Sequence, residues 1–171
     1  NRDFPDTLNL LVTERKEVGI FCQNDFCFLL DKEGVIFENV PKEMPLLKIQ
    51  NLNYLNSGKE IKLGEKIIEK EILSPILEAE TKLRDYNLPS TLPPERAPNL
   101  KIVEVSIISE ERINAKTSEG WEIYFNPKKD INWQLIKLKA VLENEIPAEK
   151  RKDLESIELR FGNFANPKYK D

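Results

Sequence analysis

The sequence predicts an α+β protein in which an antiparallel or mixed β-sheet carries two main helices on one face. Short segments that alternate apolar and polar residues recur along the chain, which is the period of half-buried strands. Two longer segments, 65–86 and 130–145, instead repeat their apolar residues every three to four positions, as a helix with one buried stripe does. The order of strands, helix, three strands, helix and last strand favours helices packed on a single face.

The first third of the chain is predicted to consist of strands and turns. Residues 7–15 alternate in part between apolar and polar side chains, which predicts a strand. Segments 18–22 and 26–31 flank three polar residues, so we expect a β-hairpin there. Residues 31–37 then form a turn and a strand, with Gly34 suited to a positive φ.

Prolines mark the irregular segments. Two prolines make 38–47 extended and irregular, and four prolines make 87–99 a loop. A short extended piece is expected within 59–65. In the helix predicted over 65–86, Pro75 either kinks the helix or follows a serine that caps a second helical segment.

The carboxyl-terminal half is predicted to contain an antiparallel meander and a second helix. The strands of the meander cover 100–108, 112–117 and 121–125. Asp130 is a favourable N-cap for the helix over 130–145. After the helix, 146–154 is predicted to be a polar turn, with one helical turn after its proline as an option. The tryptophans, Trp121 and Trp133, are both expected to be core anchors.

The segment 156–164 ends the pattern with another strand, because its apolar residues alternate with charged ones. A last strand often forms the edge of a sheet, where backbone N–H and C=O groups have no partner. Either another segment covers this edge or a partner binds it. Phe164 and Tyr169 lie beyond the alternating residues, where a role in partner binding is as good an explanation as core packing.

Composition argues against nucleic-acid binding, whereas missing targeting segments in a fragment do not locate the whole protein. The net charge of −4 leaves no basic stripe of the kind that binds nucleic acid. The sequence contains neither an apolar run of about 18 residues, which a membrane helix needs, nor a signal peptide. Because the chain starts with Asn1 and not with methionine, we expect an excised fragment of a longer protein.

Familiar motifs for catalysis and cofactor binding are not found in the sequence. It has no histidine, no P-loop, no G-x-G-x-x-G and no G-x-S-x-G, so we expect no cofactor. The missing histidine counts against an enzyme without excluding one, because Asp/Glu or Ser-Lys pairs could act. The adjacent carboxylates Glu110 and Glu111 fall at a predicted turn, where solvated surface is the usual explanation. Cys22 and Cys27 lack further soft ligands, so we expect no metal site. They either form a disulfide across the hairpin or are two small apolar strand residues.

Several segments, taken in order over nearly the whole chain, resemble the bacterial FtsQ/DivIB cell-division proteins. In that family a short strand closes a small POTRA domain and leads into a larger β-domain. The similar segments here are "FPDTLNLLVTERKEVGIF" (4–21), "FLLDKEGVIFE" (28–38), "MPLL" (44–47), "GWEIYF" followed by "KLKAVL" (120–125 and 137–142), and "SIELRF" (156–161).

The resemblance implies three parts and a non-enzymatic function. Residues 1–16 would be the last strand of a truncated POTRA domain, 17–165 the β-domain and 166–171 a tail. The family is anchored in the cytoplasmic membrane by a single amino-terminal helix, which this chain lacks, and its domains lie on the extracytoplasmic side at the division septum. It binds the FtsB/FtsL pair, or DivIC/FtsL, and helps to regulate septal peptidoglycan synthesis.

The resemblance also implies where the partner binds. In the family, the partner adds a strand to the sheet edge at the carboxyl-terminal strands. The arginine after the Asp-Leu pair, equivalent to Arg160, meets a partner acid. The partner-binding residues implied here are Arg160, Phe161, Gly162, Asn163, Phe164 and Ala165.

Two other functions stay open from the sequence, and so does a domain that only adds stability, which a tail 165–171 covering the edge of the last strand would favour. One is an extracytoplasmic hydrolase that uses a pair of carboxylates, which would require a deep cleft. The other is a POTRA-linked adaptor for membrane-protein assembly, although the serial repeats typical of such adaptors are not present in the sequence.

Overall fold

The computed structural model of the chain describes residues 11–86, 88, 91 and 99–170. The strands are β1 (Glu17–Gln23), β2 (Phe26–Asp31), β3 (Ile36–Val40), β4 (Lys48–Asn51), β5 (Ile102–Ser109), β6 (Arg112–Thr117), β7 (Glu122–Phe125), β8 (Leu154–Glu158) and β9 (Asn166–Tyr169). The helices are α1 (Leu52–Leu55), α2 (Lys70–Asp85), α3 (Ile131–Asn144) and the 3-10 helix η1 (Ala148–Asp153).

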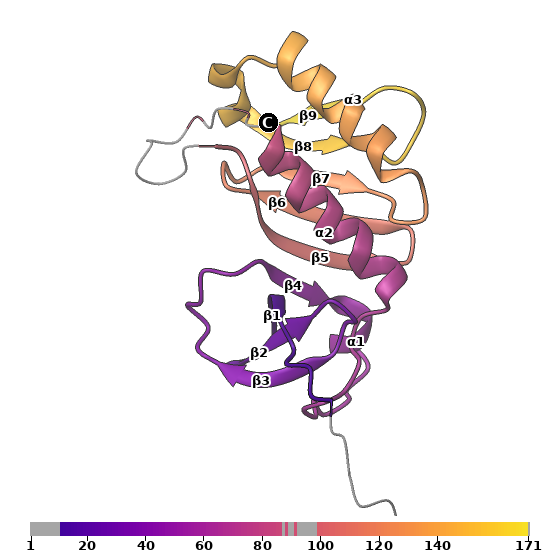
Figure 1. The fold of residues 1–171 in the computed structure, drawn as a ribbon. Coiled ribbons are helices and arrows are strands. Elements are labelled where there is room, and N and C mark those ends of the chain that lie inside the picture. Colours follow the sequence, from indigo (N-terminus) through magenta and orange to yellow (C-terminus); the bar gives the residue numbers. More distant parts are fainter. Residues whose placement is uncertain (1–10, 87, 89–90, 92–98, 171) are drawn as a thin grey trace, which may run out of the picture.

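The strands described form one mixed sheet in the order β3-β2-β1-β4-β5-β6-β7-β8-β9 (Figure 1). Three neighbouring pairs are parallel, namely β1–β4, β4–β5 and β7–β8, and the others are antiparallel. The predicted α+β class and the predicted β5–β6–β7 meander are therefore confirmed.

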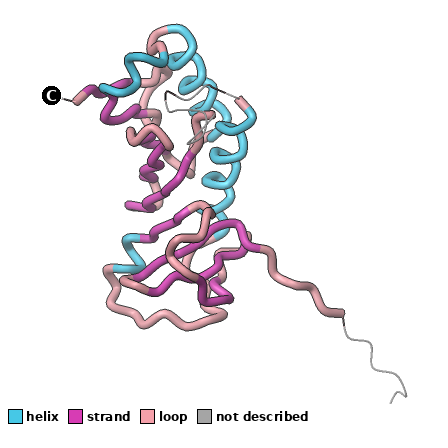
Figure 2. Tube along the Cα trace, turned by 90° about the vertical axis from the view of Figure 1, so that its left-hand side faces the viewer, coloured by secondary structure: helices cyan, strands magenta, loops and turns pink. Residues whose placement is uncertain are grey.

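Chain connectivity explains why both long helices cover the same face of the sheet. Each is a crossover between adjacent parallel strands: α2 joins β4 to β5, and α3 joins β7 to β8. Both crossovers step in the same direction along the sheet between strands of the same orientation. Since such connections are almost always right-handed, both helices must lie on one side. The two views agree with this arrangement (Figures 1 and 2).

The core fills the space between this face of the sheet and the two helices. Helix α2 contributes its predicted stripe, including Ile76, Ala79 and Leu83. The predicted N-cap of α3 is confirmed, because Asp130 accepts hydrogen bonds from two backbone N–H groups of the first turn. Helix α2 continues through Pro75, so no second segment begins there.

The hairpin of β1 and β2 and the turn after it form as predicted. Cys22 faces Cys27 across the hairpin and is joined to it by a disulfide. Gly34 has a φ of 82°, as expected for the next turn. Its carbonyl oxygen accepts the backbone N–H of Ile67 at 2.9 Å, so this turn packs against the segment before α2. That segment is therefore not helical, and α2 begins at Lys70 instead of residue 65.

Two predictions fail in the amino-terminal half, and two elements there were not predicted. The strand predicted over 7–15 is wrong for residues 11–15, which have no regular structure, and 7–10 lie outside the described residues. No strand forms within 59–65. Strand β4 and helix α1 have no counterpart in the prediction, because four residues are too few to display a period. Most of the loop 87–99 also lies outside the described residues.

Where the chain is described, its helices are too short or too polar to cross a bilayer.

Candidate partner-binding surface

Strand β8 is not the edge of the sheet. Ile157 pairs with Ile123 of the parallel strand β7 on one side and with Pro167 of the antiparallel strand β9 on the other. The expectation that the last strand, predicted over 156–164, offers a free edge at 156–163 is therefore wrong, because the strand that forms is β8 and it is paired on both sides. The edge is instead β9, within the segment that the sequence predicted to be a tail, and residues 159–165 connect the two strands.

The outer side of β9 presents a reduced set of backbone groups. The N–H of Lys170 donates to the carbonyl oxygen of Asp153 at 2.9 Å, so Lys170 points toward β8. Because successive residues of a strand point in opposite directions, Pro167 and Tyr169 direct their backbone groups outward. Proline has no N–H to donate. The outward groups at these two positions are thus the N–H and C=O of Tyr169 and the C=O of Pro167.

Arg160, the first predicted site residue, is already engaged. Its Nε donates to Oε1 of Glu158 at 2.8 Å, and its backbone N–H donates to the same oxygen at 2.9 Å. Burial would raise the pKa of Glu158, but the hydrogen bonds from Arg160 outweigh it and hold that pKa below its ordinary value. The Arg160 guanidinium also lies 4.9 Å from the ring centroid of Phe161.

Two lysines fix the backbone of the β8–β9 connection. Lys137 of α3 is buried, and its Nζ donates to the carbonyl oxygens of Leu159 at 2.7 Å and Gly162 at 3.1 Å. Lys129, just before α3, donates to the carbonyl oxygen of Arg160 at 2.9 Å. The connection is therefore tied to α3 through its backbone, and the side chains of Phe161, Asn163 and Phe164 remain exposed to solvent.

An apolar groove of about 460 Å³ lies between α3 and this connection. Trp133 and Ile136 of α3 line it with 47% and 52% of their surface exposed, and Phe164 lines it with 78% exposed. The other lining residues are Lys137, Ala140, Val141, Glu145, Asn163, Ala165, Asn166 and Pro167. Because Asn166 and Pro167 belong to β9, the groove is continuous with the free edge. We call the groove and the outer side of β9 together the β9 surface.

The structure separates the six predicted site residues into two groups. Asn163, Phe164 and Ala165 line the groove. Arg160, Phe161 and Gly162 do not, although Phe161 is more than half exposed.

Sequence reasoning missed the helical wall of the groove. Trp133 was expected in the core, which is wrong, whereas Trp121 is 1% exposed as expected. The signal was present in the helix itself, because Trp133 falls midway between Ile131 and Leu135 of the buried stripe and so points away from the core.

The buried Lys137 leads to a pH-dependence prediction. Burial lowers its pKa from the ordinary 10.5, and the nearby Lys129 ammonium lowers it further. The folded protein therefore binds this proton more weakly than the unfolded chain, so the free energy of unfolding gains a contribution as the pH rises from the lowered pKa to 10.5. Lys137→Met should lack that gain in urea denaturation from about pH 8 to about pH 11.

The control for this measurement is Lys150→Met, because Lys150 is exposed on η1. This variant should keep the gain in stability with pH. If the free energy of unfolding of both variants rises with pH in parallel with that of the unmodified protein, Lys137 is not the group responsible.

Metal-ligating groups and the carboxylate pair are the remaining sequence-based candidates among the described residues. Among these residues, no group of three or more His, Cys, Asp or Glu side chains could hold a metal ion. Of the carboxylate pair at the β5–β6 turn, Glu110 forms an ion pair with Lys128 on the surface. No model of a known protein family matches this chain, and no curated protein matches it either.

Proposed function

We propose that this chain is the partner-binding part of a non-enzymatic adaptor of the FtsQ/DivIB type. In this proposal an extended segment of an FtsB/DivIC-like protein, together with its FtsL-like companion, binds along β9. The protein is then anchored in the cytoplasmic membrane through a helix outside this chain, acts on the extracytoplasmic side at the septum and helps to regulate septal peptidoglycan synthesis. The observation that supports the proposal best is the continuity of a free strand edge with an apolar groove.

The two parts of the β9 surface suit the two parts of a strand-addition interface. Backbone groups of an incoming strand would pair with those of Tyr169 and Pro167, each hydrogen bond contributing about 0.5–1.5 kcal/mol net. Only a few such bonds are available, so most of the affinity has to come from side chains. An apolar partner residue in the groove would bury surface of Trp133, Ile136 and Phe164 at about 25 cal/mol per Å².

The role implied for Arg160 changes under this proposal. An acid of the partner would have to compete with Glu158, whose two side-chain oxygens already accept hydrogen bonds from the Arg160 guanidinium. We therefore assign Arg160 to positioning the β8–β9 connection, with Lys129 and Lys137, and assign the binding energy to the apolar residues.

The backbone part of the proposal is tested by Tyr169→Pro, with Tyr169→Ala as its matched control. Proline removes the outward N–H and blocks an incoming strand, whereas alanine removes the ring and leaves the backbone intact. Calorimetric titration with the extracytoplasmic segment of the cognate FtsB/DivIC-like protein should show a loss of affinity of at least about tenfold for proline, which is about 1.4 kcal/mol. The Tyr169→Ala variant should lose clearly less affinity than Tyr169→Pro.

The groove is tested separately by Ile136→Ser, since Ile136 is half exposed and its loss leaves the core intact. This variant should also weaken binding while its melting temperature stays unchanged. Undiminished binding by both Tyr169→Pro and Ile136→Ser would refute the proposed surface. No binding of the cognate segment by the unmodified chain would refute the proposed function itself.

A further inference from the structure

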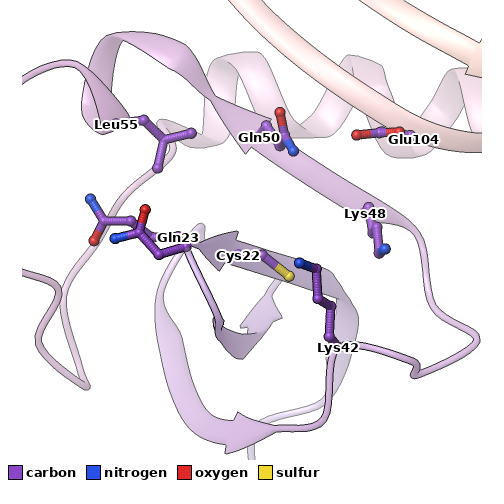
Figure 3. A pocket seen from close by; sticks show the side chains of 8 residues that line it. Cys22, Gln23, Lys42, Lys48, Gln50, Leu55 and Glu104 are labelled. Atoms are coloured by element: carbon purple, nitrogen blue, oxygen red, sulfur yellow. The ribbon is translucent and has the colours of Figure 1, made fainter.

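A second feature lies in the amino-terminal half of the sheet, where β1 and β4 separate. Only one residue pair, Ile20 with Lys48, joins these parallel strands. Strand β4 continues to pair with β5 as far as Asn51, whereas β1 turns away toward the hairpin loop. A cavity of about 400 Å³ opens between them (Figure 3).

The disulfide of the hairpin is asymmetric with respect to this cavity. Cys22 lines the cavity and is partly exposed, whereas Cys27 is 1% exposed. A thiolate that attacks a disulfide must reach the sulfur along the S–S axis, so access decides which sulfur reacts. Of the two sulfurs, the one on Cys22 is open to attack from the cavity.

Two ammonium groups share the cavity with this sulfur. Lys42 comes from the connection between β3 and β4, and Lys48 comes from β4. In Figure 3 the sulfur of Cys22 and the ammonium of Lys42 point toward one another. Within the described part of the chain neither lysine forms an ion pair, and Glu104 is the single acid among the residues that line the cavity.

We propose that this cavity is a site of thiol–disulfide exchange for small anionic thiols. A thiolate attacks the sulfur of Cys22 and forms a new S–S bond, while the Cys22–Cys27 bond breaks. The electron pair leaves on Cys27, whose thiolate takes a proton from water. A second thiolate then attacks the mixed disulfide, so that the small thiol is oxidised to its own disulfide and both cysteines are reduced.

Charge makes this proposal distinct from plain reduction of an exposed disulfide. The protein carries a net charge of −4, which repels an anion from most of its surface. Any preference for an anionic thiol must therefore arise locally, from Lys42 and Lys48, and must weaken when salt screens them. The cavity shares no residue with the β9 surface, so this proposal does not depend on the proposed function and is tested separately from it.

The test compares 2-mercaptoethanesulfonate, which is anionic, with cysteamine, which is cationic. Rates of disulfide opening are expressed per thiolate and divided by the rates on a neutral small-molecule disulfide. The unmodified chain should favour the anionic thiol by at least about threefold at low salt, and the preference should vanish near 1 M salt. Peptide mass spectrometry after alkylation should find the mixed disulfide on Cys22 and the alkyl group on Cys27.

Matched variants assign the preference to the cavity. Lys42→Met with Lys48→Met should abolish it, and the corresponding double arginine variant should keep it. Lys150→Met with Lys152→Met changes the net charge equally, but on η1, and should leave the preference intact. Thermal melts identify any variant that fails to fold. If the double methionine variant does not fold, the double arginine variant and the salt dependence of the unmodified chain test the role of the two lysines. A preference that survives loss of both cavity lysines, or a mixed disulfide on Cys27, would overturn the proposal.

Discussion

Replacing Gly34 by alanine should destabilise the protein by at least about 3 kcal/mol, because backbone strain and a steric clash act together. The residue has a φ of 82°, where a side chain costs about 1–2 kcal/mol. A Cβ at this position would also lie 1.8 Å from the carbonyl oxygen of Ile68, and backbone on both sides prevents an easy adjustment. Urea denaturation followed by circular dichroism measures the loss.

Gly64→Ala provides the matched control for this prediction. Gly64 has a nearly identical φ of 85°, but a Cβ there would meet no atom within 4 Å. Its substitution should therefore cost about 1–2 kcal/mol, the strain alone. Equal losses at the two glycines would show that the turn moves away from Ile68 at no cost, contrary to the packing described above.

Trp121→Ala should cost about 3–5 kcal/mol, the range for removing a large aromatic residue from a close-packed core. The side chain is buried, and its indole N–H also donates to Oε2 of Glu119 at 2.9 Å. The side chain of Glu119 is only 1% exposed, with Arg151 as a neighbour. Loss of the indole thus opens a cavity and takes a donor from a buried carboxylate.

Two further substitutions separate these contributions. Trp121→Phe keeps most of the packing but loses the donor, so it should cost about 1–3 kcal/mol. Trp133→Ala removes the same side chain from a half-exposed position and should hardly change the urea midpoint, although it should weaken partner binding. Circular dichroism is the suitable measurement, because each variant alters tryptophan fluorescence. A large stability loss at Trp133, or none at Trp121, would contradict the core assignment.

The elements that could be predicted from the sequence are those whose signals are local. The turn at Gly34, the N-cap at Asp130 and the stripe of α2 each depend on residues close together in the chain. The class of the fold follows from their order. The disulfide between Cys22 and Cys27 was one of two open alternatives, because sequence spacing permits a bridge without requiring it.

The edge of the sheet could not be predicted in the same way. Which strand is last depends on pairing between segments, and β9 has four residues and a proline, so it shows no alternating pattern. The groove has a similar origin, because it requires α3 and the β8–β9 connection to be placed together. Of its walls, only Phe164 and its neighbours were proposed from the sequence: Phe164 as an aromatic residue beyond the alternating strand and by resemblance, Asn163 and Ala165 by resemblance alone.

Pro167 on the outer side of β9 has a consequence for the behaviour of the protein in concentrated solution. Two copies that met β9 to β9 would face each other with a donor missing on both sides, and such a contact would gain little from the backbone. Pairing of two copies through β9 is therefore disfavoured, although an uncovered edge strand normally promotes such pairing. The edge at β9 can therefore stay accessible to a strand of another protein without favouring self-association.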